Sequence, residues 1–85
     1  MLIVNHTHIN VSIDFTNWGD AVYDLRIPIQ LTVKQLLIEL EKTLGLNMSE
    51  HVLFAIKVTT KQLLLADDDY VMDFPVTDGD YLIIL

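Results

Sequence analysis

Tyr81-Leu82-Ile83-Ile84-Leu85 is the stretch that decides the fold of this 85-residue sequence, and it follows the turn Thr77-Asp78-Gly79-Asp80. Five apolar residues in succession are typical of a strand that is buried on both faces of a sheet. We therefore expect this run to form a central strand. We also expect Leu85 to lie inside the fold, with no flexible tail after it.

Two hairpins are predicted from residues that alternate between apolar and polar. The first would pair a strand over 8–15 with one over 23–28, where Pro28 ends the ladder because it cannot donate a hydrogen bond. The second would pair a strand over 54–59 with one over 62–65, and its register is weakly determined. The inward side chains would be Ile9, Val11, Ile13, Phe15, Tyr23, Leu25, Ile27, Ile56 and Val58.

A helix is predicted over 33–44. Thr32 and Gln35 have the spacing of a capping box, in which each side chain bonds to the main chain of the other residue. Apolar residues then recur at helical spacing, and Gly45 offers a left-handed stop with Leu46 placed to pack back on the last turn. The solvent-facing positions would include Lys34, Glu41 and Lys42.

The remaining segments are predicted to be loops. Residues 47–51 form a polar connection, and 67–69 form a solvated acidic corner. Residues 70–76 form a short irregular stretch that Met72 and Phe74 would anchor. One helix with a single apolar stripe can cover one face of one sheet, so we expect a two-layer α+β sandwich with a mixed sheet of four to five strands. The last strand would lie beside the first and parallel to it.

Composition limits the classes of partner. The 85 residues suffice for a single domain, with 1–7 as an N-terminal extension. A net charge of −7 disfavours nucleic acid and bare membrane as partners, and favours a basic protein surface.

No apolar stretch approaches the length of a membrane span, and the N-terminus lacks the pattern of a signal peptide, so we expect a soluble protein without direct membrane insertion. The sequence contains no cysteine, which excludes disulfides and thiolate chemistry.

Candidate metal and catalytic residues are few. His6 and His8 could begin a zinc site but no third ligand is evident, and 67–69 lacks the alternating ligands of a calcium loop. Ser12, Ser49 and His51 fall on different elements with no catalytic motif around them. We expect no enzymatic activity, no metal and no cofactor.

Two surface features suggest protein binding. If Leu82 and Ile84 face the helix, Tyr81, Ile83 and Leu85 face outward beside Lys57 on the neighbouring strand. This stripe is either an ordinary apolar part of an open sheet face or a contact surface. Trp18 is either packed over the sheet edge or exposed as an interface anchor.

The order of elements resembles the ubiquitin family of β-grasp folds. The strings that carry this resemblance are Thr32-Val33, Lys61-Gln62-Leu63 and Asp73-Phe74-Pro75-Val76. Nearly the whole chain from Ile9 to Leu85 is also similar to the EsaB/YukD-type proteins of bacterial type VII (ESX-like) secretion systems. The strings here are Val11-Ser12-Ile13-Asp14-Phe15-Thr16-Asn17, Tyr23-Asp24-Leu25, Ile56-Lys57-Val58-Thr59-Thr60-Lys61 and Asp78-Gly79-Asp80.

The resemblance implies a cytoplasmic accessory or regulatory protein that binds a membrane-associated secretion component and is not conjugated to other proteins. The sequence has no Gly-Gly tail, and Lys57 stands where ubiquitin carries its main recognition isoleucine, so ubiquitin's partners are not carried over. The alternative is a homo-oligomeric scaffold, for example a homodimer, whose outer sheet face pairs with itself.

Overall fold

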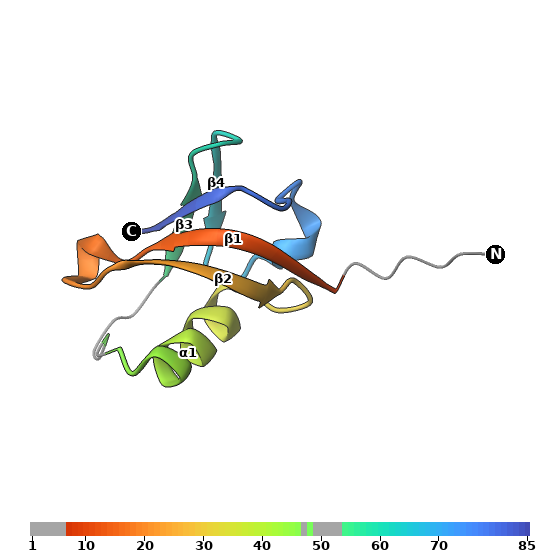
Figure 1. Cartoon of the computed structure of the whole chain (residues 1–85). Helices are drawn as coiled ribbons and strands as arrows, with labels where there is room; N and C mark the ends of the chain where they lie inside the picture. Colours follow the sequence, from red (N-terminus) through yellow and green to blue (C-terminus); the bar gives the residue numbers. More distant parts are fainter. Residues whose placement is uncertain (1–6, 47, 49–53) are drawn as a thin grey trace.

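The computed structural model describes residues 7–46, 48 and 54–85, and the elements follow the predicted order (Figure 1). Five strands, one α-helix and two short 3-10 turns make up this part of the chain. They are β1 (His8–Asp14), η1 (Thr16–Trp18), β2 (Val22–Pro28), α1 (Val33–Leu44), β3 (Ala55–Val58), β4 (Leu63–Ala66), η2 (Val71–Asp73) and β5 (Tyr81–Ile84).

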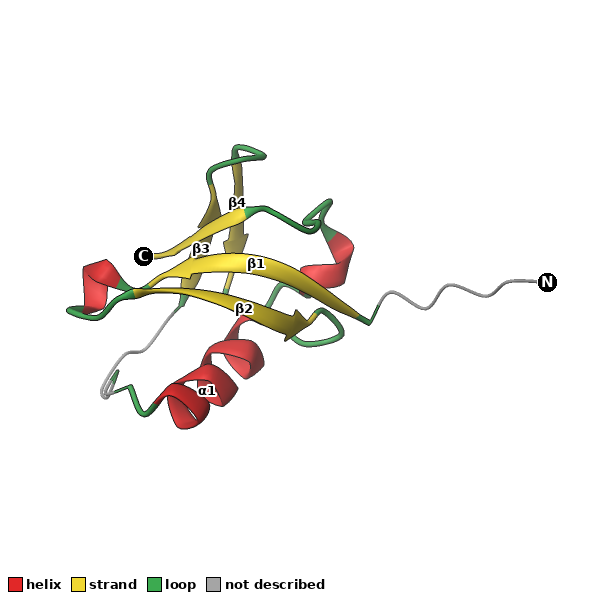
Figure 2. Ribbon diagram, viewed as in Figure 1, coloured by secondary structure: helices red, strands yellow, loops and turns green. Residues whose placement is uncertain are grey.

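The strands form one mixed sheet in the order β2-β1-β5-β3-β4. β5 runs parallel to β1 and antiparallel to β3, which confirms that the apolar run near the end of the sequence is the central strand. The helix α1 packs against one face of this sheet and leaves the other face open (Figures 1 and 2). The molecule is therefore the expected two-layer α+β sandwich, and the open side is called the outer face below.

Local signals set both ends of α1. The Thr32 hydroxyl accepts from the Gln35 amide at 3.2 Å, and the Gln35 side chain accepts from the Thr32 amide at 3.0 Å. Gly45 adopts the left-handed conformation with φ 68°, and the Leu46 amide donates to the Glu41 carbonyl at 2.9 Å. The predicted helix bounds and the capping box are confirmed.

The core lies between α1 and the inner face of the sheet. The predicted alternation is confirmed for β1, β3 and β5, whereas Tyr23 and Leu25 of β2 are only half-buried because β2 is an edge strand. The fully buried side chains with the largest volumes are Phe15, Ile13, Ile27, Leu36, Leu37, Met48, Ile56, Leu65, Leu82 and Ile84. Burying so many large apolar groups is the main favourable term in the stability of such a small domain.

Three predictions about exposure are wrong. Leu85 was expected inside the fold from the apolar run but is 47% exposed, and its side chain faces the outer side of the sheet, as the alternation along the strand predicted. Met72 was expected to anchor the stretch 70–76 but is 52% exposed, and Val71 and Val76 are the buried residues there, with Phe74 half-buried. Glu41 is half-buried rather than exposed, because its carboxylate accepts from the Met48 amide at 3.1 Å.

The acidic corner is also less solvated than predicted. Asp67 accepts from the Phe54 amide at 3.0 Å, and Asp69 accepts from the Ala66 amide at 2.8 Å. Of the three aspartates only Asp68 is exposed. Two of these carboxylates therefore serve as main-chain caps at the ends of β3 and β4. Most of the polar connection 47–51 and of the extension 1–7 lies outside the described residues.

Candidate protein-binding surface

The pairing of the strands fixes which side chains are neighbours on the outer face. Ile83 of β5 lies opposite Asp14 of β1 on one side and opposite Lys57 of β3 on the other. Lys57 in turn lies opposite Leu64 of β4. Because paired residues project from the same face of a sheet, these four side chains form one row across the outer face.

An apolar patch covers the half of the outer face made by β3, β4 and β5. It consists of Ala55, Leu64, Ala66, Ile83 and Leu85. Leu64 is 63% exposed and is the most exposed large apolar side chain of the described residues. Leu64 was not predicted as a surface residue, although alternation with the inward-facing Leu63 and Leu65 requires its side chain to point outward.

The surface around the apolar patch is hollowed. One open hollow of about 580 Å³ is lined by residues that include Phe54, Leu64 and Leu85. A second, of about 670 Å³, is lined by residues that include Lys57, Leu64 and Leu85. Leu64 and Leu85 border both hollows. A partner side chain could enter either hollow and contact the same two leucines.

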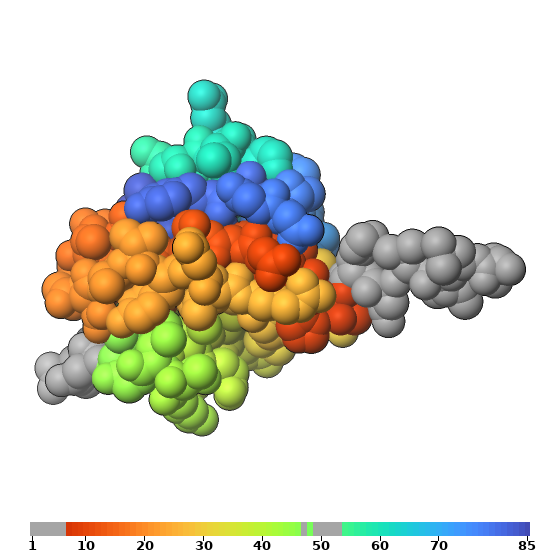
Figure 3. All heavy atoms as spheres, viewed as in Figure 1, coloured from red at the N-terminus to blue at the C-terminus, as the bar shows by residue number. Residues whose placement is uncertain are grey.

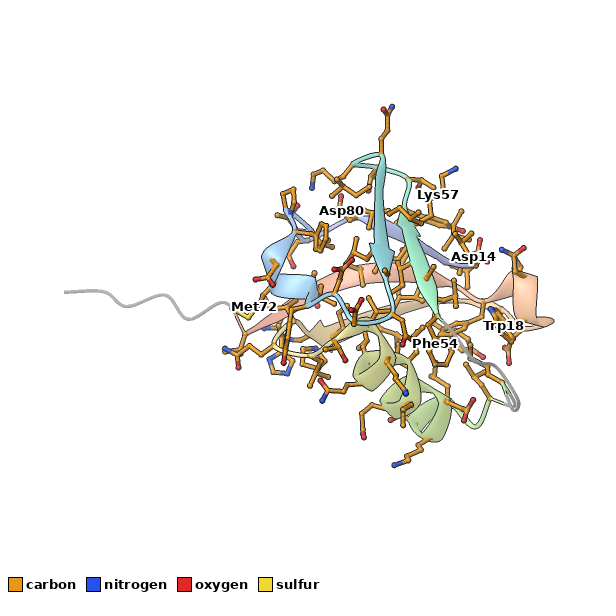
Figure 4. The ribbon with its side chains drawn as sticks, turned by 180° about the vertical axis from the view of Figure 1, so that it is seen from behind. Asp14, Trp18, Phe54, Lys57, Met72 and Asp80 are labelled. Carbon is orange, nitrogen blue, oxygen red and sulfur yellow. The ribbon has the colours of Figure 1, made fainter. Side chains whose placement is uncertain are left out.

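Lys57 is the charged group inside this surface. Its side chain is exposed and extends from β3 away from the helix (Figure 4). Within the described part of the chain no carboxylate lies within ion-pairing distance of Lys57. Its ammonium is therefore available to a partner, and the surface combines an apolar centre with one unpaired cation.

Tyr81 lies where the apolar patch meets the polar half of the outer face. Its hydroxyl donates to the Asp14 carboxylate at 2.7 Å, so the phenol leans toward β1. Hydrogen bonds from the side chain and amide of Thr16, and then from Tyr81, lower the pKa of Asp14, and the same bond to Asp14 raises the pKa of Tyr81. Both groups therefore keep their charge states at neutral pH, with Asp14 ionised and Tyr81 protonated.

Trp18 takes the packed position, one of the two alternatives predicted for it, and its role as an interface anchor stays a prediction. It is half-buried and packs against the core, and its indole nitrogen donates to the Leu85 carbonyl at 3.2 Å. The neighbouring Asn17 donates to the Ile84 carbonyl at 3.2 Å. The turn after β1 therefore holds the end of β5, and it brings Trp18 beside Leu85 at the margin of the apolar patch.

The other candidate residues do not assemble into a chemical site in the described part of the chain. His6, Ser49 and His51 lie outside the described residues, and His8 has only the Thr7 hydroxyl beside its ring, at 2.9 Å. The Ser12 hydroxyl donates to Asp24 at 2.6 Å, a contact between β1 and β2. Among the described residues no group of three His, Cys, Asp or Glu side chains is placed to bind a metal ion, and no helix is long and apolar enough to cross a membrane.

Comparison with solved structures confirms the ubiquitin-like fold. One similar structure, described as molecular mimicry of SUMO that promotes DNA repair, aligns with a TM-score of 0.74 at 18% identity and covers 96% of this chain and 95% of the other. The C-terminal ubiquitin-like domain of mouse tubulin-specific chaperone e aligns with a TM-score of 0.62 at 17% identity, over 96% and 89% of the two chains. At these identities the likeness concerns the fold alone.

Comparison of sequences identifies the family. Residues 8–84 match the family model described as WXG100 protein secretion system (Wss), protein YukD. The type VII secretion system accessory factor EsaB of Staphylococcus aureus strains Newman and COL is 37% identical over 78 residues, which is 92% of this chain and 96% of that protein. This chain belongs to the YukD/EsaB family of type VII secretion system accessory factors.

Proposed function

We propose that this protein is a non-enzymatic, cytoplasmic accessory protein that docks reversibly, through the apolar patch, onto a membrane-associated component of a type VII secretion apparatus. The observation that carries the proposal is the position of Leu64 and Leu85. Two large apolar side chains, 63% and 47% exposed, stand together between two hollows and beside the unpaired Lys57. A mainly apolar contact area that also carries a charged group suits a reversible protein interface.

The proposed docking is non-covalent. The 85 residues contain no Gly-Gly pair, and the described main chain of Leu85 is held at both ends. Its amide donates to the Ala55 carbonyl at 3.0 Å, and its carbonyl accepts from Trp18 at 3.2 Å. These two bonds hold Leu85 against the sheet, so that its side chain contributes to the apolar patch.

Electrostatics adds a prediction about the partner. The net charge of −7 favours encounter with a basic surface, whereas Lys57 at the centre of the interface calls for a carboxylate on the partner. We therefore expect a partner surface with apolar side chains, at least one acidic group among them and a basic periphery. Added salt should slow association more than it speeds release, because steering acts before contact.

The test is a pair of charge substitutions in a strain with an active type VII system. Leu64→Glu and Ile83→Glu should abolish secretion of the system's substrates while leaving the melting curve nearly unchanged. Met72→Glu is the matched control, since Met72 is also apolar and, at 52%, exposed, but lies on η2, away from the patch. Leu36→Ala in the core is the stability control and should cost about 2–5 kcal/mol through cavity formation.

Photo-crosslinking identifies the partner. A photoreactive residue at position 64 should form adducts with a component of the membrane fraction, and the same residue at Glu39, exposed on α1, should not. Full secretion by both patch variants would contradict the proposed function. Adducts between two copies of this chain at position 64 would instead favour the alternative in which the outer face pairs with itself.

A further inference from the structure

The two edge strands of the sheet, β2 and β4, differ in whether their outward N–H and C=O groups form hydrogen bonds. At β1 the even-numbered residues bond toward β5, since Gly79 donates to the Asn10 carbonyl at 2.8 Å and Ser12 donates to the Asp80 carbonyl at 3.1 Å. In an antiparallel pair successive residues alternate in the direction of their N–H and C=O groups. The odd-numbered residues of β1 therefore bond to β2.

The register then shows which groups of β2 are open. Tyr23 and Leu25 lie opposite Ile13 and Val11, so their main-chain groups are used inside the sheet. Val22, Asp24 and Arg26 consequently direct their N–H and C=O groups away from β1, at the edge of the sheet. In the described part of the chain no group occupies them, and the atoms of β2 lie at the surface between those of β1 and α1 (Figure 3).

At the opposite edge, β4, a nearby residue of the chain already bonds to some of the outward main-chain groups. The Ala66 amide donates to the Asp69 carboxylate at 2.8 Å, and the Ala66 carbonyl accepts from the Asp69 amide at 3.1 Å. Only Leu64 is left with outward main-chain groups on this short strand. β2 is thus the edge on which an added strand can form a regular ladder.

The side chains on the β2 edge indicate what kind of strand can pair with it. Asp24 and Arg26 lie two residues apart on the outer face and carry opposite charges. Asp24 accepts only from the Ser12 hydroxyl, and the Arg26 guanidinium has a single long contact with the Asn10 side chain at 3.5 Å. Within the described residues neither forms an ion pair. Charged residues on an edge strand commonly prevent another strand from pairing with it. An acidic and a basic residue two positions apart nevertheless permit one antiparallel pairing, in which each charge lies opposite an unlike charge of the added strand.

We propose that two copies of this chain pair antiparallel through β2, with Asp24 of each copy opposite Arg26 of the other. Because both residues direct their main-chain groups outward, each such pair can exchange two main-chain hydrogen bonds and also bring unlike charges together. The half-buried Leu25 then lies opposite Leu25 of the second copy. A shift of the register by two residues would place Asp24 opposite Asp24, so the charges select this register.

The dimer would join the two sheets without covering the apolar patch. Paired residues project from the same face, so both outer faces would lie on one side of the combined sheet and both helices on the other. The patch belongs to β3, β4 and β5, at the far side from β2. This inference is therefore independent of the proposed docking function, and it would make that docking bivalent.

The test measures the mass of the full chain by sedimentation over a concentration series at low salt. Wild type should form a concentration-dependent dimer, and Arg26→Glu should weaken dimerisation about tenfold or more, because two attractive pairs become repulsive. Lys34→Glu makes the same change of charge on α1 and should leave dimerisation intact. A wild-type chain that remains a 9.7 kDa monomer at millimolar concentration would overturn the proposal.

Complementary charge variants test the register. Asp24→Arg and Arg26→Asp should each fail to self-associate, yet a mixture of the two should form a heterodimer, since every pair of charges is then unlike.

Hydrogen exchange gives a readout that a folding defect would not produce. The amides of Val22, Asp24 and Arg26 should become protected as concentration rises, while those of Tyr23 and Leu25 are already protected. Association that is unaffected by Arg26→Glu but lost in Leu64→Glu would refute edge pairing and place the contact on the outer face.

Discussion

Asp80 is the one buried charged residue of the described chain, and replacing it with asparagine is the sharpest test of how the fold is held together. The residue is 5% exposed, and its carboxylate joins the turn before β4 to the turn before β5. It accepts from the Lys61 ammonium at 2.8 Å, from the Thr60 hydroxyl at 2.7 Å and from the Thr77 amide at 2.9 Å. The two turns are distant in sequence, so this carboxylate stabilises tertiary rather than local structure.

The expected loss follows from these contacts. Hydrogen bonds to a charged group contribute about 1.5–3 kcal/mol each, and breaking a buried pair costs about 3–5 kcal/mol. The Lys61 side chain is 34% exposed, so water can replace part of its bond when the charge of Asp80 is removed. We therefore expect Asp80→Asn to lower the free energy of unfolding by about 2–4 kcal/mol, a large part of the 5–15 kcal/mol that is usual for such domains.

The effect should depend on pH. Burial alone raises the pKa of Asp80, but hydrogen bonds from Lys61, Thr77 and Thr60, together with the Lys61 charge, outweigh burial and lower it. A carboxyl with a lowered folded-state pKa stabilises the protein above its unfolded pKa, near 3.9, and this stabilisation is lost as the pH falls through the folded-state value. Wild type and Asp80→Asn should therefore differ most at neutral pH and converge in strong acid.

Urea denaturation at pH 7 and at acid pH measures both quantities. Asp68→Asn is the matched control, since Asp68 is exposed at the acidic corner, and Lys61→Met completes a double-mutant cycle with Asp80→Asn. The cycle should show a coupling of the two residues well above the 0.3–0.5 kcal/mol expected of independent sites, at roughly 1 kcal/mol or more. An Asp80→Asn variant as stable as wild type at pH 7, or a difference that does not change with pH, would refute the reasoning.

Two further substitutions test local features of the chain. Gln62 adopts φ 54°, a left-handed conformation that costs a residue with a Cβ about 1–2 kcal/mol. Gln62→Gly should therefore raise the free energy of unfolding by roughly 1 kcal/mol. A lower urea midpoint in this variant would show that the Gln62 side chain makes stabilising contacts. Thr32→Ala removes the hydroxyl that caps α1 and should cost about 0.5–2 kcal/mol by the same measurement. Thr43→Ala, at an exposed position in the same helix, should be neutral or slightly stabilising, and an equal loss in both variants would argue against the cap.

Sequence alone determined the features that depend on near neighbours in the chain. The bounds of α1 were predicted correctly because a capping box and a left-handed glycine act within a few residues of the ends that they set. The alternation of apolar residues likewise assigned Ile83 to the outer face and Leu82 to the core, since the side-chain period of a strand is two. The apolar run 81–85 likewise predicted a central strand that lies parallel to the first strand.

Tertiary structure decided what the chain presents to partners. The apolar patch exists because β3, β4 and β5 lie side by side, and no short window of sequence shows that Leu64 and Leu85 border the same hollows. The same is true of Asp69, which was predicted to be solvated but closes the β4 edge, whereas the β2 edge stays open. These properties depend on hydrogen bonds and contacts between residues far apart in sequence, and such pairings are fixed only when the sheet is assembled.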